Sequence, residues 1–128
     1  MRKKSLQEEM CPMARSVEAV GDWWSLLIVR DAYAGIRRFS DFQRSLGIAK
    51  NILSSRLKAL VALSVLRVET TKRGHREYVL TEKGAELRPI LDALSLWGRN
   101  HLFSDDELAQ LDVVMREKRL TQRERSSA

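Results

Sequence analysis

The sequence predicts a mainly α-helical (α+β) fold in which two helices joined by a short turn are followed directly by a two-stranded hairpin. Three observations predict it. Apolar residues recur at helical spacing through most of the chain, glycines separate these segments, and the spacing changes to alternation after Ser64. With 128 residues, of which 44% are hydrophobic and 31% charged, the chain has the size and composition of one folded domain.

We therefore expect a single domain over residues 1–128, with a core at about 11–103 and flexible ends at 1–10 and 120–128. No apolar run approaches the ~18 residues that a membrane span requires, and the charged first ten residues lack the apolar core of a signal sequence. The protein is expected to be cytoplasmic. Its one cysteine, Cys11, excludes an internal disulfide framework.

Two helices are expected before the central pair. Pro12 suits the first turn of a helix that ends before Gly21, and Asp22 can cap a second helix that continues to about Ala34. In the first helix the apolar residues recur at helical spacing: Met13, Val17 and Val20. In the second helix the side chains expected to point inward are Trp24, Leu27 and Ile28.

The central pair of helices is separated by a turn that contains glycine. Residues 37–39 are expected to form an extended link, and residues 40–43 (Ser-Asp-Phe-Gln) have the form of a capping box that opens a short helix. That helix ends near Gly47, residues 48–49 form the turn, and a longer helix follows over about 50–63. Two helices joined in this way are typical of a helix-turn-helix.

The hairpin follows the second of these helices without interruption. In the first strand Leu66, Val68 and Thr70 face one way and alternate with Arg67, Glu69 and Thr71. Residues 72–76 form a basic turn that contains a glycine, and residues 77–80 return as the second strand. A helix-turn-helix followed by such a hairpin is a winged helix-turn-helix, with the hairpin as its two-stranded wing.

Two further helices are expected after the wing. Thr81 can cap a helix in which Pro89 produces a kink or marks a late start. The apolar stripe of that helix consists of Leu87, Ile90, Leu91, Leu94 and Trp97. Residues 104–107 form a second capping box, which opens a last helix with Leu108, Leu111 and Met115 on one side. The polar tail from Leu120 to Ala128 is expected to fray.

The net excess of positive charge lies in the centre of the chain. Residues 37–76 contain ten basic and two acidic residues, a net charge of +8, whereas the rest of the chain carries 13 basic and 15 acidic residues. A run of like charge is often only a solvated surface. Here it coincides with the helix-turn-helix and the wing, which favours a polyanion as the partner.

The helix expected over 50–63 has two different faces. Leu53, Leu57, Leu60 and Val61 fall on one side, and Asn51, Ser54, Ser55 and Lys58 fall on the other. The helix contains no acidic residue, although a solvated helix usually mixes Glu with Lys. Asn, Ser and basic side chains are suited to base edges in the major groove, where a carboxylate would be repelled by phosphates.

We therefore predict that the protein binds double-stranded DNA. The helix supplies contacts to bases and phosphates, and the link and the wing supply phosphate or minor-groove contacts. The predicted DNA-binding residues are Arg37, Arg38, Lys50, Asn51, Ser54, Ser55, Arg56, Lys58, Lys72, Arg73, His75 and Arg76.

The sequence resembles the HxlR-type winged-helix regulators of bacteria from about Cys11 to Arg99. The pieces that carry the resemblance are Cys11-Pro12, residues 20–28 (VGDWWSLLI), 38–42 (RFSDF), 47–57 (GIAKNILSSRL), 78–84 (YVLTEKG) and 94–98 (LSLWG). The resemblance implies a homodimer whose N- and C-terminal helices pair across a two-fold axis on a pseudo-palindromic operator. Departures from the family pattern are Trp23 in place of Lys, Ser64 in place of Gly, and a wing without Pro-Pro.

Two regulatory inputs are open. Cys11 matches the position of a redox-sensing cysteine in some relatives, and the start of a helix with Arg15 one turn away would stabilise its thiolate. The alternative for Cys11 is a small buried residue at the dimer interface. A pocket for a small effector could be lined by Trp23, Trp24, Phe42 and Trp97, with Phe103 nearby, although ordinary core packing is the alternative for these rings.

No catalytic motif is present, so we expect no enzyme and no cofactor. The two histidines, His75 and His101, and the single cysteine are too few and too scattered for a metal site. A transcriptional repressor is the expected function. The alternatives are a winged-helix module for protein interaction or dimerisation without specific DNA binding, and an RNA-binding winged helix.

Overall fold

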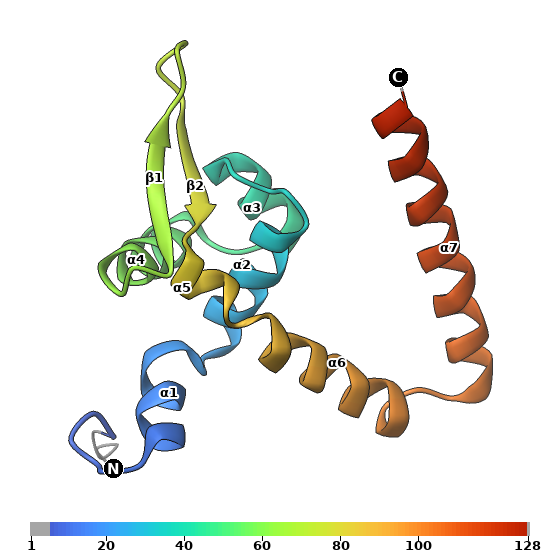
Figure 1. Ribbon diagram of the computed structural model, residues 1–128, viewed down its shortest axis with the longest axis horizontal. Coiled ribbons are helices and arrows are strands. Elements are labelled where there is room, and N and C mark those ends of the chain that lie inside the picture. Colours follow the sequence, from blue (N-terminus) through green and yellow to red (C-terminus); the bar gives the residue numbers. More distant parts are fainter. Residues whose placement is uncertain (1–5, 128) are drawn as a thin grey trace. The chain divides into compact units, whose positions relative to one another are not determined.

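The computed structural model describes residues 6–127, so residues 1–5 of the predicted flexible N-terminus, and Ala128, lie outside the described part. Figure 1 shows the order of its elements, which are α1 (Pro12–Val20), α2 (Trp23–Tyr33), α3 (Phe39–Leu46), α4 (Lys50–Ala62), β1 (Leu66–Thr70), β2 (Arg76–Leu80), α5 (Glu82–Ala85), α6 (Arg88–His101) and α7 (Asp105–Ser127). The predicted fold class, mainly helical with a two-stranded antiparallel hairpin, is confirmed.

The described residues form two compact units, one that ends at Leu91 and one that begins at Asp92. The first unit contains α1 to α5 and the hairpin, and the second contains most of α6 and all of α7. That residues 1–128 make a single domain stays a prediction, and each unit is described by itself.

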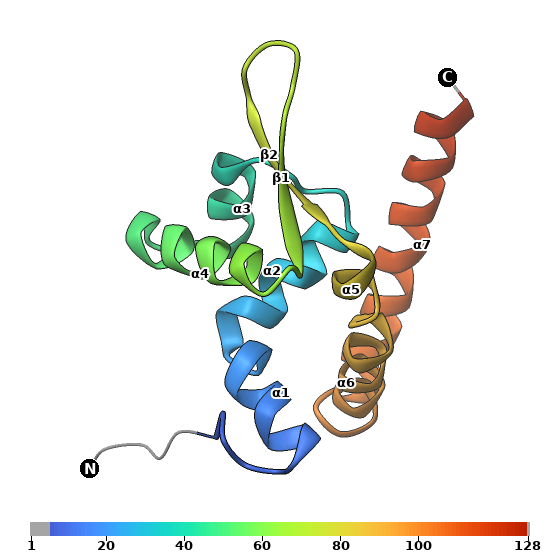
Figure 2. The ribbon, with the colours of Figure 1, turned by 60° about the vertical axis from the view of Figure 1, so that its left-hand side comes forward.

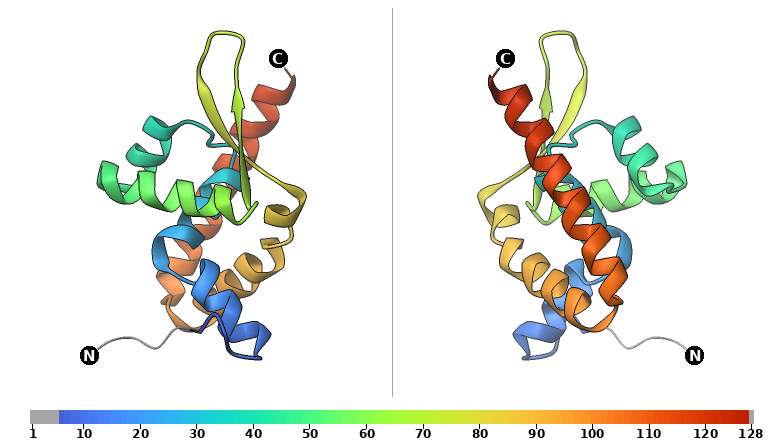
Figure 3. Two further views of the ribbon diagram at one scale, coloured as in Figure 1. Left: turned by 90° about the vertical axis from the view of Figure 1, so that its left-hand side faces the viewer. Right: turned by 90° about the vertical axis from the view of Figure 1, so that its right-hand side faces the viewer.

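The core of the first unit lies among α2, α3, α4 and the base of the hairpin. Its buried apolar residues are Val20, Ile28, Val29, Phe42, Ile48, Leu53, Leu57, Leu60, Val65 and Leu66. Helices α3 and α4 lie next to each other, and the hairpin projects beyond them (Figures 2 and 3). The basic turn is therefore the part of the hairpin that lies farthest from the core.

Helix α3 begins two residues earlier than predicted, because a capping box at residues 40–43 would make Asp41 the first helical residue. Phe39 is its first residue and packs against the core, so the prediction that Phe39 belongs to the extended link is wrong. Arg38 occupies the N-cap position, where no side chain bonds to the helix. Ser40 therefore lies inside the helix, and the predicted capping box of residues 40–43 is also wrong because burial of Phe39 moved the helix start.

The turn between α3 and α4 depends on a glycine. Gly47 has a φ of +61°, which only a residue without a Cβ adopts freely, and its N–H donates to the carbonyl of Gln43 at 2.9 Å. The Gln43 amide also donates to the carbonyl of Ile48 at 3.4 Å. These bonds hold the turn that sets the angle at which α4 begins.

The hairpin is joined to the link that precedes α3. Strands β1 and β2 pair in an antiparallel register that places Leu66 opposite Leu80 and Glu69 opposite Glu77. The N–H of Tyr78 donates to the carbonyl of Arg37 at 2.8 Å, so the link runs beside β2. The wing is thereby attached to the helix-turn-helix on the side away from β1.

The predicted caps at Thr81 and Ser104 are present, but the prediction of one helix between them is wrong, because the chain forms two helices there, α5 and α6. Thr81 accepts a bond from the N–H of Gly84 and caps the one-turn helix α5. Pro89 lies in the first turn of α6, so the late start, rather than a kink, is correct. Ser104 and Glu107 form the reciprocal capping box that opens α7. Helix α7 continues to Ser127 and so extends past the point where fraying was expected.

The end of α4 is closed by a Schellman motif around Ser64. The N–H of Val65 donates to the carbonyl of Leu60 at 3.0 Å, and the N–H of Ser64 donates to the carbonyl of Val61 at 2.9 Å. Ser64 is the residue other than glycine that has a positive φ, +61°, in the described part of the chain. The motif forms without the usual glycine at the cost of this left-handed backbone.

We expect the substitution Ser64→Gly to raise the free energy of unfolding by about 1 kcal/mol, because glycine removes the penalty of a Cβ in the left-handed region. The measurement is urea unfolding followed by circular dichroism. Ser54→Gly, the same change inside α4, is the matched control and should lower the free energy by about 0.5 kcal/mol. A decrease for both variants would contradict strain at Ser64.

Candidate nucleic-acid interface

The two predicted faces of α4 are present in the structure. Leu53, Leu57 and Leu60 are fully or almost fully buried against the core. The polar side chains that share the opposite side are exposed: Asn51, Ser54, Ser55 and Lys58. Because α4 contains no acidic residue, this surface offers hydroxyl, amide and ammonium groups without a carboxylate of its own.

The first turn of α4 is open to an external partner. Ala49 occupies the N-cap position and provides no side-chain acceptor for the first N–H groups of the helix. Uncapped N–H groups and the positive end of the helix dipole favour an anion such as a phosphate. Lys50 and Asn51 are exposed in the same turn. The start of α4 is therefore the part of the helix best suited to approach the DNA backbone and base edges.

Arg56 faces the body of the first unit rather than solvent alone. Its Nε atom lies 3.5 Å from Oδ2 of Asp22. The same oxygen accepts a bond from the N–H of Ser25 at 3.0 Å and so caps α2. Arg56 thus ties α4 to the start of α2, while its side chain remains 42% exposed.

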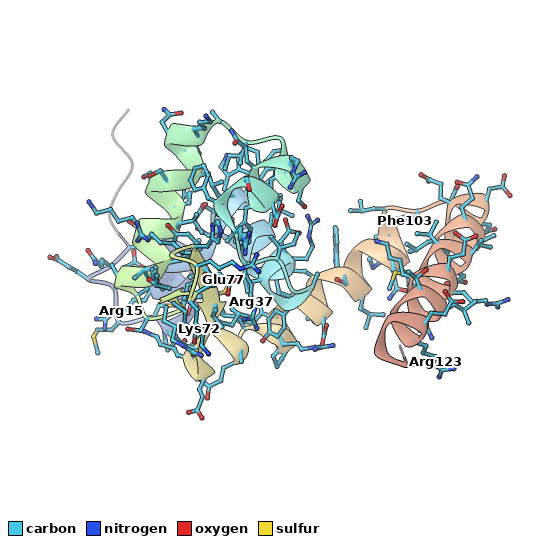
Figure 4. All side chains as sticks on the ribbon, turned by 90° about the horizontal axis from the view of Figure 1, so that it is seen from above. Arg15, Arg37, Lys72, Glu77, Phe103 and Arg123 are labelled. Carbon is cyan, nitrogen blue, oxygen red and sulfur yellow. The ribbon has the colours of Figure 1, made fainter. Side chains whose placement is uncertain are left out.

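The two arginines of the link converge on one carboxylate. The Oε1 atom of Glu77 is 3.9 Å from a guanidinium nitrogen of Arg37, and its Oε2 atom is 3.8 Å from Nε of Arg38. Figure 4 shows Arg37 beside Glu77. About half of each arginine side chain remains exposed, whereas Glu77 is 19% exposed. Glu77 therefore holds both guanidinium groups beside β2 while leaving their outer sides open.

The tip of the wing carries its cations on an ordered turn. The N–H of Thr71 donates to the carbonyl of His75 at 2.8 Å, and the N–H of His75 donates to the hydroxyl of Thr71 at 3.1 Å. The basic side chains of the turn are all exposed: Lys72, Arg73, His75 and Arg76. Arg76 also lies over the ring of Tyr78, 5.8 Å from its centroid. Figure 4 labels Lys72, which marks this tip.

Sequence reasoning missed the residues that hold the far end of α4. The ammonium of Lys83 donates to the carbonyl of Leu63 at 2.6 Å, and the hydroxyl of Thr81 bonds to the carbonyls of Ser64 and Val65. Gly84 is buried so closely that a Cβ there would lie 2.1 Å from the carbonyl oxygen of Val65. In the sequence, Thr81 stands out as a helix cap and the run to Gly84 as part of the family resemblance, but the contacts of these residues with the end of α4 depend on the fold.

Glu77 was missed for a related reason. In the sequence it is only the first residue of a strand, and its position between two arginines depends on the register of the hairpin. The one available signal is the alternation of the strand, which places Glu69 and Glu77 on the face opposite to Leu66.

The residues proposed for regulation lie in different surroundings. Cys11 is exposed at the N-cap of α1, where its sulfur accepts from the N–H of Ala14 at 3.5 Å. It lines a shallow groove with Met10, Pro12 and Arg15. Arg15 itself donates to the carbonyl of Glu9 at 2.7 Å and to the sulfur of Met10. Cys11 is therefore accessible to small reagents in the single chain.

The four predicted effector residues do not share one environment. Phe42 is completely buried and Trp24 packs against the same core, so core packing describes both. Trp23 is 72% exposed, with its ring centroid 5.8 Å from that of Trp24. Trp97 lies on α6, is exposed, and contacts the ring of His101. An effector pocket made by these residues stays a prediction.

Within residues 6–127, no three His, Cys, Asp or Glu side chains come together as a metal site would require. No helix among the same described residues has the length and apolar character needed to cross a membrane.

Comparison with known proteins assigns the fold to a family. The model of the HxlR-like helix-turn-helix family matches residues 19–106. An uncharacterized HTH-type transcriptional regulator of Mycobacterium tuberculosis is 44% identical over 92 residues, which cover 70% of this chain and 58% of that protein. The chain thus matches less than two thirds of this relative's length.

Solved structures give the same assignment. The crystal structure of PA1607, a candidate transcription factor, is 48% identical with a TM-score of 0.77 and covers 81% of this chain and 74% of that one. The oxidized form of the redox regulator HypR is 28% identical with a TM-score of 0.65 and covers 71% of this chain and 97% of that one.

The matched region contains α2 to α6, and therefore the exposed face of α4, the arginines of the link and the wing. A helix-turn-helix of this kind is the DNA-binding part of a transcriptional regulator. The chain belongs to the HxlR-like helix-turn-helix family of transcriptional regulators.

Proposed function

We propose that the chain is a cytoplasmic, homodimeric transcriptional repressor that binds a pseudo-palindromic operator. The observation that carries the proposal is the exposed, acid-free face of α4, whose opposite side is buried in the core. A helix anchored in this way can enter the major groove as a rigid unit. Repression is the default because steric exclusion of polymerase requires no further contact surface.

The exposed residues divide into two roles. Asn51, Ser54 and Ser55 lie in the N-terminal half of α4, the part of a recognition helix that meets base edges. The cations around them contact phosphates and supply affinity without sequence choice. These cations are Arg37, Arg38, Lys50, Lys58, Lys72, Arg73 and Arg76, with His75 beside them at the tip of the wing.

The homodimer is supported by apolar residues that one chain leaves exposed. On α1 these are Met13 and Val17, which are 75% and 45% exposed. On α6 they are Ile90, Leu94 and Trp97, which recur at helical spacing and are about half exposed. Exposed apolar residues that follow one helix face are typical of an interface. A second copy would cover them and present two copies of α4 to half-sites about 34–36 Å apart.

We expect Lys58→Ala to weaken binding to every duplex. The slope of the logarithm of the association constant against the logarithm of the salt concentration should flatten by about 0.9 for each phosphate contact that is lost. A dimer loses two such contacts, so the change in its slope should be about twice as large. The measurement is a fluorescence-anisotropy titration at several salt concentrations. Lys58→Arg keeps the charge and is the matched control, which should retain the slope. An unchanged slope for Lys58→Ala would exclude a phosphate partner for this ammonium.

Asn51→Ala should relax sequence preference at one or two operator positions, because an amide that pairs with a base edge contributes about 1–3 kcal/mol of discrimination. Selection of bound duplexes from a random pool, with the variant and the unaltered chain in parallel, measures this preference. Affinity for random duplexes should change little. A uniform decrease in affinity for all sequences would instead assign Asn51 to the backbone.

A redox input at Cys11 is the second proposal for this protein. It is supported by the exposure of the thiol at a helix start and by the likeness to the redox regulator HypR. A small effector near Trp23 and Trp24 is the alternative input. In the redox case, diamide should shift operator affinity of the unaltered chain, and Cys11→Ser should abolish the shift while leaving the reduced affinity unchanged. The same response in both chains would reject the sensor.

A winged-helix module that contacts only protein is the alternative function. Titration calorimetry with operator-length DNA and RNA duplexes at modest salt distinguishes the cases. Salt-sensitive association with DNA supports the repressor, association with RNA alone supports the RNA-binding alternative, and no association with either supports the protein module.

A further inference from the structure

Glu77 lies against both arginines of the link that precedes α3. Its two carboxylate oxygens are 3.9 Å from a nitrogen of Arg37 and 3.8 Å from a nitrogen of Arg38, and Figure 4 shows Arg37 beside it. A charge-assisted hydrogen bond is shorter, at roughly 2.7–2.9 Å. The carboxylate therefore attracts both guanidinium groups without locking either of them, and about half of each arginine side chain stays exposed.

The link is a place where a phosphate can bind. Arg38 is the N-cap residue of α3 and provides no side-chain acceptor for the first turn of that helix, which favours an anion there. The acid of this first turn, Asp41, is paired with Arg44. A DNA phosphate that approached the link would meet the positive charges of Arg37 and Arg38 and, beside them, the negative charge of Glu77.

The backbone of the link does not depend on this carboxylate for its position. The N–H of Tyr78 donates to the carbonyl of Arg37 at 2.8 Å, and Phe39 packs against the core. Both contacts remain when the charge of residue 77 is removed. A partly exposed ion pair also contributes little to stability. The main physical effect of the Glu77 carboxylate is therefore its negative charge close to two cations.

The hairpin does not gain from this charge either. The register places Glu77 directly opposite Glu69, and like charges in that arrangement destabilise a pair of strands. Glu69 has a cation of its own, because its Oε1 atom accepts bonds from Arg67 at 2.8 and 3.0 Å. The two acids on this face of the hairpin therefore neutralise different cations, and only Glu77 faces the link.

We propose that Glu77 competes with DNA phosphates for Arg37 and Arg38 and thereby limits the affinity of the protein for DNA. This inference rests on the phosphate contacts proposed above and deepens them. In the free chain the carboxylate offsets one of the two positive charges of the link. On binding, the guanidinium groups exchange part of this attraction for contacts with phosphates, so the gain in free energy is smaller for every duplex, whatever its sequence.

The consequence is binding that depends more strongly on base contacts. Phosphate contacts supply affinity without sequence choice, and a regulator that binds every duplex tightly is retained at non-specific sites. A carboxylate beside the cations of the link reduces this sequence-independent part of the affinity. The contacts that Asn51, Ser54 and Ser55 make with bases then form a larger share of the total binding free energy.

Glu77→Gln tests the inference in the full-length chain, because glutamine keeps an acceptor oxygen beside the guanidinium groups and removes only the negative charge. Fluorescence-anisotropy titrations are made with a duplex selected from a random pool and with an unrelated duplex. At roughly 0.1 M salt the variant should bind both more tightly, on the order of fivefold, and by the same factor. An unchanged or lower affinity overturns the proposal.

The dependence on salt gives a second measurement on the same variant. The slope of the logarithm of the association constant against the logarithm of the salt concentration should become steeper by up to about 0.9 per chain. The reason is that one more positive charge of the link becomes available to phosphates. A gain in affinity with an unchanged slope would place the effect of Glu77 outside the phosphate contacts and would overturn the competition.

Glu69→Gln is the matched control. It removes the same charge from the same face of the hairpin, directly opposite Glu77, but from a carboxylate whose cation is Arg67. Its affinity for either duplex should change by less than about twofold. An equal gain for both variants would show that only the net charge of the wing matters, and the role assigned to the contact with the link would be wrong.

A double-mutant cycle tests the coupling to the arginines. In a chain that carries Arg37→Ala and Arg38→Ala, measured at low salt because its affinity is reduced, Glu77→Gln should lose most of its effect. The same gain with and without the two arginines would overturn the competition. Circular dichroism of each variant confirms that it folds.

The unaltered chain separates failure of this inference from failure of the proposed function. If the unaltered chain binds duplexes and Glu77→Gln has no effect, the role of Glu77 is overturned and the DNA-binding function stands. If the unaltered chain binds no duplex at any salt concentration, both are overturned.

Discussion

The burial of one side of α4 is the constraint on which the rest of the structure depends. Leu53, Leu57 and Leu60 are almost completely removed from solvent, and each such side chain contributes about 1.5–3 kcal/mol when it is buried. Because these residues recur at helical spacing, burying them determines which side chains point outward. The packing of the leucines therefore also orients the polar, acid-free face of α4 toward solvent.

The same helix is held at both ends. At its start, the left-handed Gly47 turns the chain from α3, and further along Arg56 reaches the carboxylate that caps α2. At its end, the backbone motif at Ser64 is reinforced by the hydroxyl of Thr81 and the ammonium of Lys83. A recognition helix fixed in this way loses little conformational entropy on binding, which is the physical advantage of a preorganised surface.

The exposed surfaces of the chain fall into two chemical classes that serve different partners. The cations of the link, α4 and the wing suit a polyanion, and Glu77 keeps two of them in place without covering them. The apolar faces of α1, α6 and α7 suit protein, and in the proposed dimer a second copy covers them. Binding of DNA and self-association can therefore proceed on separate surfaces, with symmetry providing the link between them.

The sequence by itself determined the features that depend on neighbouring residues. The order of the helices and strands, the caps at Asp22, Thr81 and Ser104, and the two faces of α4 all follow from side chains within a turn or two of each other. Such interactions form within a single segment, so they can be predicted from the order of the residues alone. At Pro89 the sequence left a kink and a late start both open, and the structure has the late start of α6.

Only the tertiary structure decided the features that join distant segments. The start of α3 at Phe39 reflects burial against residues from other helices, which overrides the local capping signal at Ser40. The ion pair of Arg56 with Asp22, the position of Glu77 beside Arg37, and the clamp of Lys83 on α4 bring together residues 20 to 40 positions apart. These contacts form only when the helices and strands pack together. The local sequence around each residue therefore does not predict them.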